Sequence, residues 1–476
     1  MKRYTRTLAT ALLSTACLTL AGAPSFALDL PQAQKYEMGP LGDWYLSGGV
    51  SGNIAGWNHN SPCAGAPGSQ CAGSVATPGA GSLNGDVSIN NAIAILNSKG
   101  NMFGSVPLQM HAWVGIPPNT PVMGYTSPNV SPNLHALGSD ANGFGHTSPL
   151  FKGWATYQPL DVFSVEAGRL PSPDGTEIGV GFLNPTVFLS DLNNMQTTVA
   201  DGVQVNFISG ADKSFYYGFL PGYGSTLTVR LADGYKTGHP NELGFTGLWN
   251  LNPDGSSAIV AFGHTRLGTV GSVADNTSSG TGRVAGFGTV NAKLAGIGAF
   301  YNVGALMISP EVEYQWLSKS DIPSSVRLAT GQDYYNVATQ VTFSYDFGLV
   351  NMFGEPIRLG FAVQPSYIYQ HGDSADPNRQ ALGNFLGLNT GAGDPVGGFT
   401  LGTFGAGSRM FGIQANPTFQ FHNFFVRPAV AYTRLASIEP GFGYGATGNS
   451  HDQFVGLLEV GFLFGQQMDT DTGQHP

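Results

Sequence analysis

The segment FGIQANPTFQF, residues 411–421, places an apolar residue at every odd position and a small or polar residue at every even one. Strict alternation over this length predicts a β-strand with two chemically different faces. Phe411 and Ile413 lie on the apolar face, whereas Gln414 and Asn416 lie on the polar face. A soluble sheet would bury the apolar face in a core, and a membrane-spanning sheet would turn it towards lipid.

The same alternation recurs along the chain and favours the membrane interpretation. The clearest further examples are VPLQMHAWV (106–114), ISPEVEYQW (308–316), YNVATQVTFSYDF (335–347), IRLGFAVQPSYIYQ (357–370) and FFVRPAVAY (424–432). Several of these segments exceed the usual soluble strand of about 5–6 residues and are long enough for a membrane-spanning strand, which needs about 9–11. A soluble sandwich would leave their wide aromatic faces in water. The pattern therefore predicts an all-β fold, an antiparallel transmembrane β-barrel with lipid outside and a wet lumen inside.

Counting such segments gives about 16 strands, with 14 to 18 as the range. The predicted strands are 43–56, 84–96, 103–114, 150–158, 161–170, 199–208, 225–232, 243–250, 257–265, 292–303, 306–318, 334–347, 357–370, 410–421, 424–436 and 453–464. Short turns alternate with long loops between them, which is typical of outer-membrane barrels. Residues 211–224 are interpreted as part of a connection. If they form a strand, a second additional strand is needed to keep the number of strands even, and the count becomes eighteen.

Four prolines conflict with this pattern, because proline removes a ladder hydrogen bond and is usually confined to sheet edges. Pro310, Pro365, Pro417 and Pro428 all fall on the apolar faces of predicted strands. A closed barrel has no edge, and the sequence alone offers no explanation for them.

The chain begins with a segment that predicts export. Lys2, Arg3 and Arg6 precede a short apolar run that ends in small residues before Leu28. This order indicates a signal peptide over residues 1–27, a barrel over 28–464 and a short polar tail over 465–476. The alternative is a membrane anchor, but the apolar run is short for one.

Composition narrows the class of partner. Charged residues make up 11% of the chain, against about 25% in soluble proteins. Without the three basic residues of the signal, 17 basic residues face 30 acidic ones, a net charge of −13. This balance argues against nucleic acid as a partner.

Two cysteines remain after the signal peptide, Cys63 and Cys71 in SPCAGAPGSQC. Their proximity in an exported, Gly- and Pro-rich segment predicts a disulfide, worth about 2–3 kcal/mol in the chain-entropy model. A metal site is the alternative, but it lacks neighbouring His or Cys ligands. The sequence predicts no metal and no cofactor.

Two stretches carry resemblances to known proteins. The last strand, FVGLLEVGFLF, resembles the C-terminal recognition strand of bacterial outer-membrane proteins, although twelve residues follow it here. That resemblance implies the barrel-assembly machinery as a partner. LDVFSVEAGRLPSPDGTEIG (160–179), TTVADGVQVNF (197–207) and TLTVRLADGY (226–235) are similar to the OmpL-like β-barrel porins. The shared features are Gly168-Arg169, a Gly-x-Glu at 175–177 and a looser match at 232–235, and they imply a diffusion channel of unspecified substrate.

The loop over 171–198 is the main candidate for a functional element. It carries Asp174, Glu177 and Asp191. In general porins a loop at about this position folds into the barrel and narrows it, with acids facing a basic wall. Two interpretations stay open here: a constriction that sets size and charge preference, or a solvated outer loop.

Charged residues on the polar faces are candidates for lining the pore. They are Lys152, Glu166, Arg230, Glu311, Glu313, Arg358, Arg427 and Glu459. The alternative is that these charges pair with one another and only keep the lumen wet and rigid.

Taken together, these features predict a porin of the cell outer membrane for passive diffusion of small hydrophilic solutes or ions. The alternatives are a substrate-specific channel, for example for carbohydrates, and a non-conducting structural or adhesive barrel. An enzyme is not expected and no catalytic residue is proposed, since His111, the one histidine placed in mid-strand, has no nucleophile among its close neighbours. Outer-membrane lipid and further copies of the chain, as in a trimer, complete the expected partners.

Overall fold

In the computed structural model the barrel wall and parts of its connections are described. The described residues are 28, 31–58, 84–99, 101–116, 123, 150–171, 174–177, 181–190, 192, 199–209, 225–233, 242–252, 257–266, 293–317, 334–352, 354–371, 409–437, 444 and 450–465. The predicted disulfide, Asp191, the segment 211–224 and the polar tail after Gly465 lie outside these residues. Among the described residues, no helix is long and apolar enough to cross a membrane.

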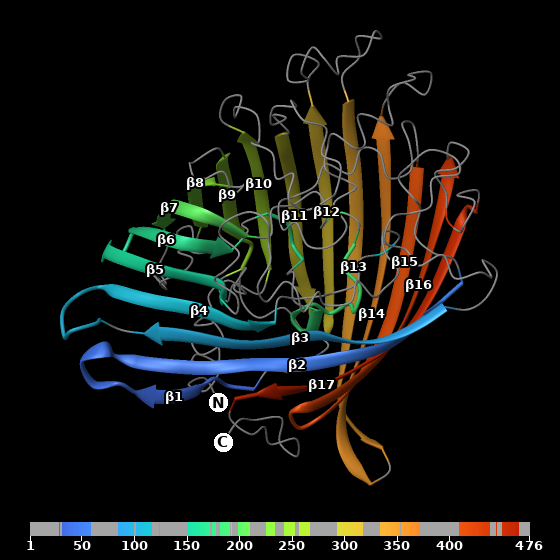
Figure 1. Ribbon diagram of the computed structural model, residues 1–476, viewed down its shortest axis with the longest axis horizontal. Helices are drawn as coiled ribbons and strands as arrows, with labels where there is room; N and C mark the ends of the chain where they lie inside the picture. Colours follow the sequence, from blue (N-terminus) through green and yellow to red (C-terminus); the bar gives the residue numbers. More distant parts are fainter. Residues whose placement is uncertain are drawn as a thin grey trace, which may run out of the picture.

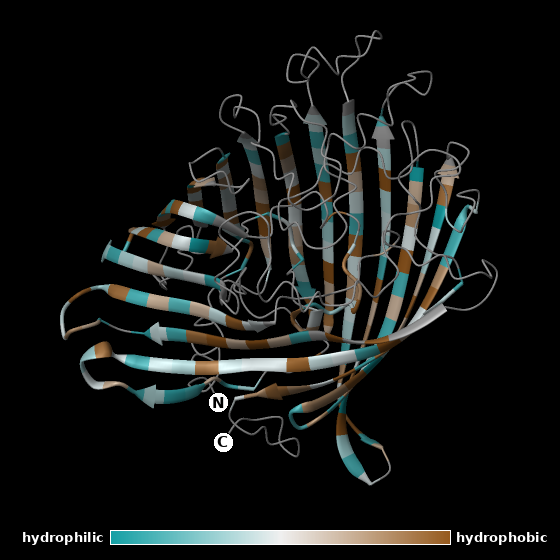
Figure 2. Cartoon of the chain, in the orientation of Figure 1, coloured by the Kyte–Doolittle hydropathy of each residue, from teal (hydrophilic) through white to brown (hydrophobic). Residues whose placement is uncertain are grey.

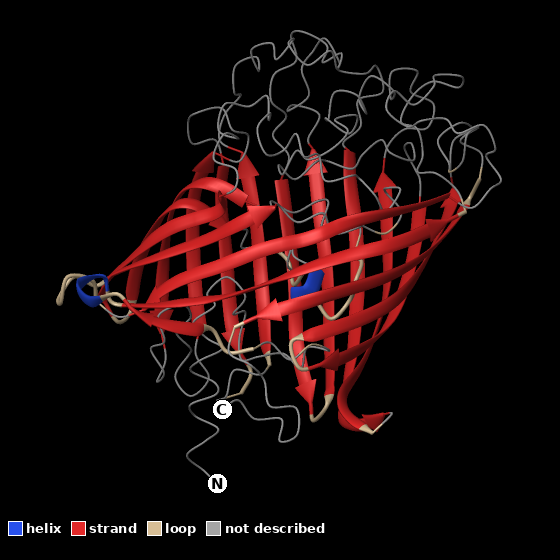
Figure 3. Cartoon of the chain, turned by 60° about the horizontal axis from the view of Figure 1, so that its bottom comes forward, coloured by secondary structure: helices blue, strands red, loops and turns tan. Residues whose placement is uncertain are grey.

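Sixteen antiparallel strands form a closed barrel (Figures 1 and 3). They are β2 (Asp43–Trp57), β3 (Asn84–Lys99), β4 (Leu108–Ile116), β5 (Leu150–Leu160), β6 (Phe163–Pro171), β7 (Val199–Ser209), β8 (Ser225–Asp233), β9 (Glu242–Asn250), β10 (Ala258–Arg266), β11 (Lys293–Val303), β12 (Leu306–Leu317), β13 (Tyr334–Met352), β14 (Glu355–His371), β15 (Arg409–Phe421), β16 (Phe424–Ser437) and β17 (Asp452–Phe464). Each strand pairs with its neighbour in sequence, and β17 pairs with β2 from Val455↔Trp57 to Phe464↔Gly48. The predicted antiparallel barrel of sixteen strands is confirmed.

One additional strand lies outside the sixteen. The short β1 (Gln34–Glu37) pairs with the first residues of β2, and the 3₁₀ turn η1 (Gly39–Leu41) connects the two. Its four residues are all exposed and show no apolar periodicity. The sequence pattern therefore gave no signal for this strand.

The two faces of the wall separate as the alternation predicts. In β15, Phe411 and Ile413 are 52% and 46% exposed on the outside, whereas Gln414 is 1% exposed on the inside. Figure 2 shows the same change of hydropathy from residue to residue along the strands. An outward apolar surface that runs around a closed barrel is stable in lipid, where every backbone group is paired within the sheet.

The four strand prolines lie at interruptions of the ladder. Pro417 and Pro428 oppose each other across β15 and β16, which pair above and below this position but not at it. The β13–β14 pairing skips Pro365, and the β11–β12 pairing skips Pro310. Each proline still pairs with the strand on its other side. The missing N–H is therefore accommodated by local gaps between two strands, without opening the barrel.

Candidate functional site: a loop docked inside the barrel

The connection between β6 and β7, residues 172–198, is called the inserted loop below. Its described parts, which include the 3₁₀ turn η4 (Gly181–Leu183), are almost wholly buried. The side chains exposed by less than a tenth are Asp174, Thr176, Phe182, Leu183, Asn184, Thr186, Val187, Phe188, Leu189, Ser190 and Leu192. A solvated outer loop would not bury these residues.

The first part of the loop meets β10 and β12. Asp174 Oδ2 lies 3.0 Å from His264 Nδ1, and both side chains are buried. The backbone N–H of Thr176 donates to Glu311 Oε2 at 3.0 Å, and the Thr176 hydroxyl donates to the same oxygen. The approach is close, because a Cβ placed on Gly298 of β11 would lie 2.6 Å from Thr176 Cγ2. Glycine at 298 therefore leaves the space in which Thr176 sits.

Glu177 joins two parts of the loop to β14. Its carboxylate accepts hydrogen bonds from the Ser190 N–H at 3.0 Å, from the Ser190 hydroxyl at 2.6 Å and from Gln364 Nε2 at 2.8 Å. Burial raises the pKa of Glu177 to about 7, against these hydrogen bonds, which favour the charged form. Its hydrogen-bond donors are uncharged.

The polar face of β15 contacts the middle of the loop. Gln414 accepts from the Phe188 N–H at 3.0 Å and donates to the Phe188 carbonyl at 2.8 Å, so that one amide side chain satisfies both backbone groups of one residue. Asn416 donates to the Pro185 carbonyl at 3.1 Å. The loop backbone at Phe188 and Pro185 is hydrogen-bonded by these side chains, and not by the backbone of a paired strand.

Arg427 of β16 binds both the inserted loop and a neighbouring strand of the wall. Its guanidinium donates to the carbonyls of Asn184 at 2.9 Å and Gly181 at 3.0 Å, and its Nε donates to Glu459 Oε2 at 2.8 Å. Arg427 is fully buried and Glu459 is 1% exposed. The buried ion pair therefore fixes the direction of the guanidinium, which in turn caps carbonyls at the 3₁₀ turn.

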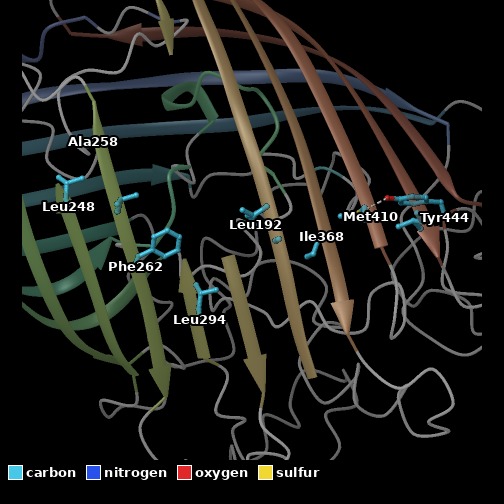
Figure 4. Packing of buried hydrophobic residues seen from close by; sticks show 11 residues of the cluster. Leu192, Leu248, Ala258, Phe262, Leu294, Ile368, Met410 and Tyr444 are labelled. Atoms are coloured by element: carbon cyan, nitrogen blue, oxygen red, sulfur yellow. Dashed lines mark hydrogen bonds between the residues drawn. The ribbon is translucent and has the colours of Figure 1, made fainter. Parts of the chain in front are cut away.

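Apolar contacts add to these polar ones. Three clusters of buried apolar residues face the lumen, and each of them includes loop residues: Phe182 and Leu183 in the first, Leu192 in the second, and Val187 with Phe188 in the third. Figure 4 shows Leu192 of the second cluster among side chains carried by β9, β10, β11, β14 and β15. The lumen is thus lined by apolar patches as well as by amides and charges. The sequence reasoning, which expected a polar interior, did not foresee them.

The other predicted pore-lining residues do not gather at one point. Lys152 Nζ lies 4.4 Å above the Trp113 ring on β4. Glu166 accepts from Thr156 and Gln204 on the two neighbouring strands.

The two remaining arginines among the pore-lining candidates are each paired within their own part of the wall. Arg230 pairs with Glu242 at 2.5 Å in full burial. Arg358 pairs with Asp346 near the short-turn end of β13 and β14. Among the candidates, Glu311 and Arg427 bind described loop residues directly, and Glu459 pairs with Arg427. Glu313 is buried on β12, two residues from Glu311.

Sequence reasoning missed the amides that hold the loop. Gln364, Gln414 and Asn416 were recognised as lumen-facing but were not assigned a role, and His264 was not placed in the site. The available signal was the recurrence of Gln and Asn at alternate positions of neighbouring strands. A simply hydrated wall could use Ser or Thr as well, whereas long amides suit the binding of a backbone.

Comparison with known proteins identifies the family. The model of the OmpL-like beta-barrel porin-2 family matches residues 46–464. Among solved structures, the channel DcaP of Acinetobacter baumannii is 13% identical, with 90% of this chain and 100% of that chain covered and a TM-score of 0.44. OprB of Pseudomonas putida is 11% identical, with 88% and 94% covered and a TM-score of 0.48. No curated protein matches the sequence significantly. The chain belongs to the OmpL-like β-barrel porin family and is a channel protein of the outer membrane.

Proposed function

We propose that this porin passes small hydrophilic solutes or ions by diffusion, and that the inserted loop is its constriction. The observation that carries the proposal is the docking of the loop on the inner wall, from Asp174 against His264 to Asn184 against Arg427. A loop held at so many points inside a barrel reduces the open cross-section and sets which charges a solute meets.

The charges around the loop support a modest preference for cations. Glu177 and Glu311 both accept hydrogen bonds from uncharged groups at the loop–wall contact. The arginines that could oppose them, Arg230 and Arg427, are compensated by Glu242 and Glu459. Above about pH 7, where Glu177 is ionised, the field at the loop is therefore expected to be negative.

A diffusive channel needs no catalytic group, and none is proposed. His111 is 2% exposed, stacks on Trp154 with ring centroids 4.7 Å apart and shares a 2.9 Å hydrogen bond with Asn97. Trp113 and Trp154 are 1% and 3% exposed. Neither indole offers a free face on which a sugar could stack, so these residues do not favour the carbohydrate-specific alternative.

Conductance in planar bilayers tests the proposal. The protein should conduct, and reversal potentials in a salt gradient should show a weak cation preference. The triple variant Asp174→Asn, Glu177→Gln, Asp191→Asn should shift the reversal potential towards anions. Asp452→Asn, which removes an acid from the outer face of β17, is the matched control and should leave the potential unchanged.

Two results would count against the proposal. An unchanged reversal potential in the triple variant would place the loop acids outside the ion path. The absence of any conductance from a folded, heat-modifiable barrel would favour the structural or adhesive alternative.

A further inference from the structure

The residues that precede β1 lead from the rim of the barrel into its interior. Leu28 and residues 31–33 are described there and are called the pre-β1 segment below. Leu28 is 3% exposed and belongs to the first cluster of buried apolar residues. The other members of this cluster are Phe182 and Leu183 of the inserted loop and the inward-facing wall residues Ile93, Ile95, Trp113, Trp154, Leu170, Phe425 and Leu463. Leu28 therefore lies inside the barrel.

Strand pairing places the pre-β1 segment at the end of β17. β3 pairs with one edge of β2 from Asp43 to Trp57. On the other edge of β2, β17 pairs as far as Phe464↔Gly48, and β1 follows from Gln34↔Leu46 onwards. β1 thus continues the line of β17 along β2, as Figure 1 shows. The residues just before β1 must therefore pass the last residues of β17.

Gly465, directly after β17, marks the point at which the segment crosses the rim. A Cβ placed on Gly465 would lie 2.4 Å from the Gln32 carbonyl oxygen and 3.2 Å from Pro31 Cβ. A side chain at position 465 would not leave room for this approach. Before the crossing, Leu28 and Pro31 are buried, and after it all four residues of β1 are exposed. The chain therefore changes from the lumen to the rim within a few residues.

The crossing lies at the short-turn end of the barrel. The Leu463 N–H near the end of β17 donates to the carbonyl of Asn423, in the short turn between β15 and β16. Short turns of outer-membrane barrels face the periplasm. The 3₁₀ turn η4 lies at the same level, since a Cβ placed on Gly49 would lie 3.0 Å from Leu463 Cδ2 and 3.1 Å from Phe182 Cζ. The inserted loop and the pre-β1 segment thus meet near the periplasmic mouth.

The two segments contact different parts of the wall. The polar contacts described above attach the inserted loop to β10, β12, β14, β15 and β16. The cluster that contains Leu28 adds the inward side chains of β3 to β6, among them Trp113 and Trp154. Leu28 is an apolar residue in a lumen whose loop contacts are largely polar. It therefore differs in chemistry from the loop residues that a solute would meet first.

We propose that Leu28 is a second constriction residue of the channel, and that the pre-β1 segment narrows its periplasmic mouth. The pairing of β1 with β2 anchors this segment at the rim, and the crossing at Gly465 directs it inwards. A solute that enters from outside passes the charges and amides of the inserted loop and then the apolar side chain of Leu28. The inference rests on the proposed function, because it assigns a further residue to the same pore.

Reversal potentials of two oppositely charged variants in planar bilayers test the proposal. Leu28→Lys should shift the permeability ratio towards anions and Leu28→Glu towards cations, each about twofold, because a charge beside the path changes the local concentration of ions. Tyr36→Lys and Tyr36→Glu are the matched controls. Tyr36 belongs to β1 and is 47% exposed, so its variants should keep the parent's ratio. Heat-modifiable migration verifies that each variant is folded.

A variant without residues 28–31 tests the width of the mouth independently of charge. The deletion leaves β1 and its pairing with β2 in place, so we expect the barrel to assemble. Its single-channel conductance should exceed that of the parent roughly 1.5-fold, because the narrowest part of a pore limits the current. Liposome swelling should also show faster entry of neutral sugars.

The outcomes separate this proposal from the proposed function. Opposite shifts at position 28, unchanged ratios at position 36 and a larger conductance of the deletion variant would support it. Equal reversal potentials for Leu28→Lys, Leu28→Glu and the parent, or a deletion variant with the parent's conductance, would overturn it. The triple variant of the loop acids would still test the inserted loop, so the proposed function could stand alone. A folded parent protein without conductance would overturn both.

Discussion

At the scale of single residues, Arg427 connects the wall to the loop. It is buried, pairs with Glu459 and donates to two loop carbonyls. Arg427→Met should destabilise the barrel by about 3–5 kcal/mol, since it leaves a buried carboxylate without its partner. The measurement is the urea midpoint of unfolding in detergent.

The matched control is Arg169→Met. The Arg169–Asp201 pair lies partly exposed on the outer face, where an ion pair contributes at most about 1 kcal/mol. Similar midpoints for the two variants would show that the buried pair does not stabilise the docked loop.

The raised pKa of Glu177 predicts that the docking of the inserted loop depends on pH. Burial raises its pKa from an ordinary 4.5 to about 7, so the docked loop holds a proton that a solvated loop would release. Docking should be tightest below about pH 4.5, weaken as the pH rises to 7 and stay constant above it. The full change is at most about 3 kcal/mol.

Single-channel recordings between pH 4.5 and 8 measure this effect. In the wild type, excursions to larger conductance should become more frequent as the pH rises towards 7. In Glu177→Gln, which cannot ionise, their frequency should not change over this interval. An identical pH profile in both proteins would assign the dependence to another group.

At the scale of elements, the opposed prolines of β15 and β16 leave a gap in the ladder. Replacing Pro417 and Pro428 together by Val supplies an N–H on each strand at directly opposed positions. Two added backbone hydrogen bonds should stabilise the barrel by about 1–3 kcal/mol. Urea unfolding of the double variant should show this gain, and a single Pro417→Val substitution should show about half of it.

The gap is also close to the loop, since Asn416 and Arg427, which bind loop carbonyls, lie next to the two prolines. If the two added backbone hydrogen bonds between β15 and β16 strained these contacts with the loop, the double variant would be less stable than the parent. That result would contradict the hydrogen-bond account and would indicate that the gap is needed for docking.

At the scale of the whole molecule, the barrel closes without the inserted loop. The ends of β6 and β7 are paired up to Pro171↔Val199, so a short Gly-Ser linker could replace residues 174–192 without stretching either strand. We expect the deletion variant to assemble and to remain heat-modifiable, because its interstrand hydrogen bonds are unchanged. Its conductance should exceed that of the parent.

The same deletion would expose three apolar lumen clusters to water. A moderate loss of stability is therefore expected along with the larger conductance. An assembled deletion variant with the parent's conductance would show that the loop does not narrow the ion path.

The sequence by itself determined the wall. Alternation is a local property, since successive side chains of a strand must point to opposite faces. The sixteen segments, their order and their outward faces could therefore be read without knowing which strands meet. β1 was the exception, because its four residues carry no alternation. Pro417 and Pro428 could be recognised in the sequence as strand prolines. That they lie opposite each other across β15 and β16 depends on the strand register, which the alternation does not define.

Only the tertiary structure decided the contents of the lumen. The loop acids could belong to a constriction or to a solvated loop, and no local pattern separates the two. The contacts that dock the loop on the inner wall join residues far apart in the sequence, as between Phe188 and Gln414. The physical reason is that strands pair with their neighbours in sequence, whereas a loop without regular structure docks through side chains whose partners are brought together only by the closed barrel.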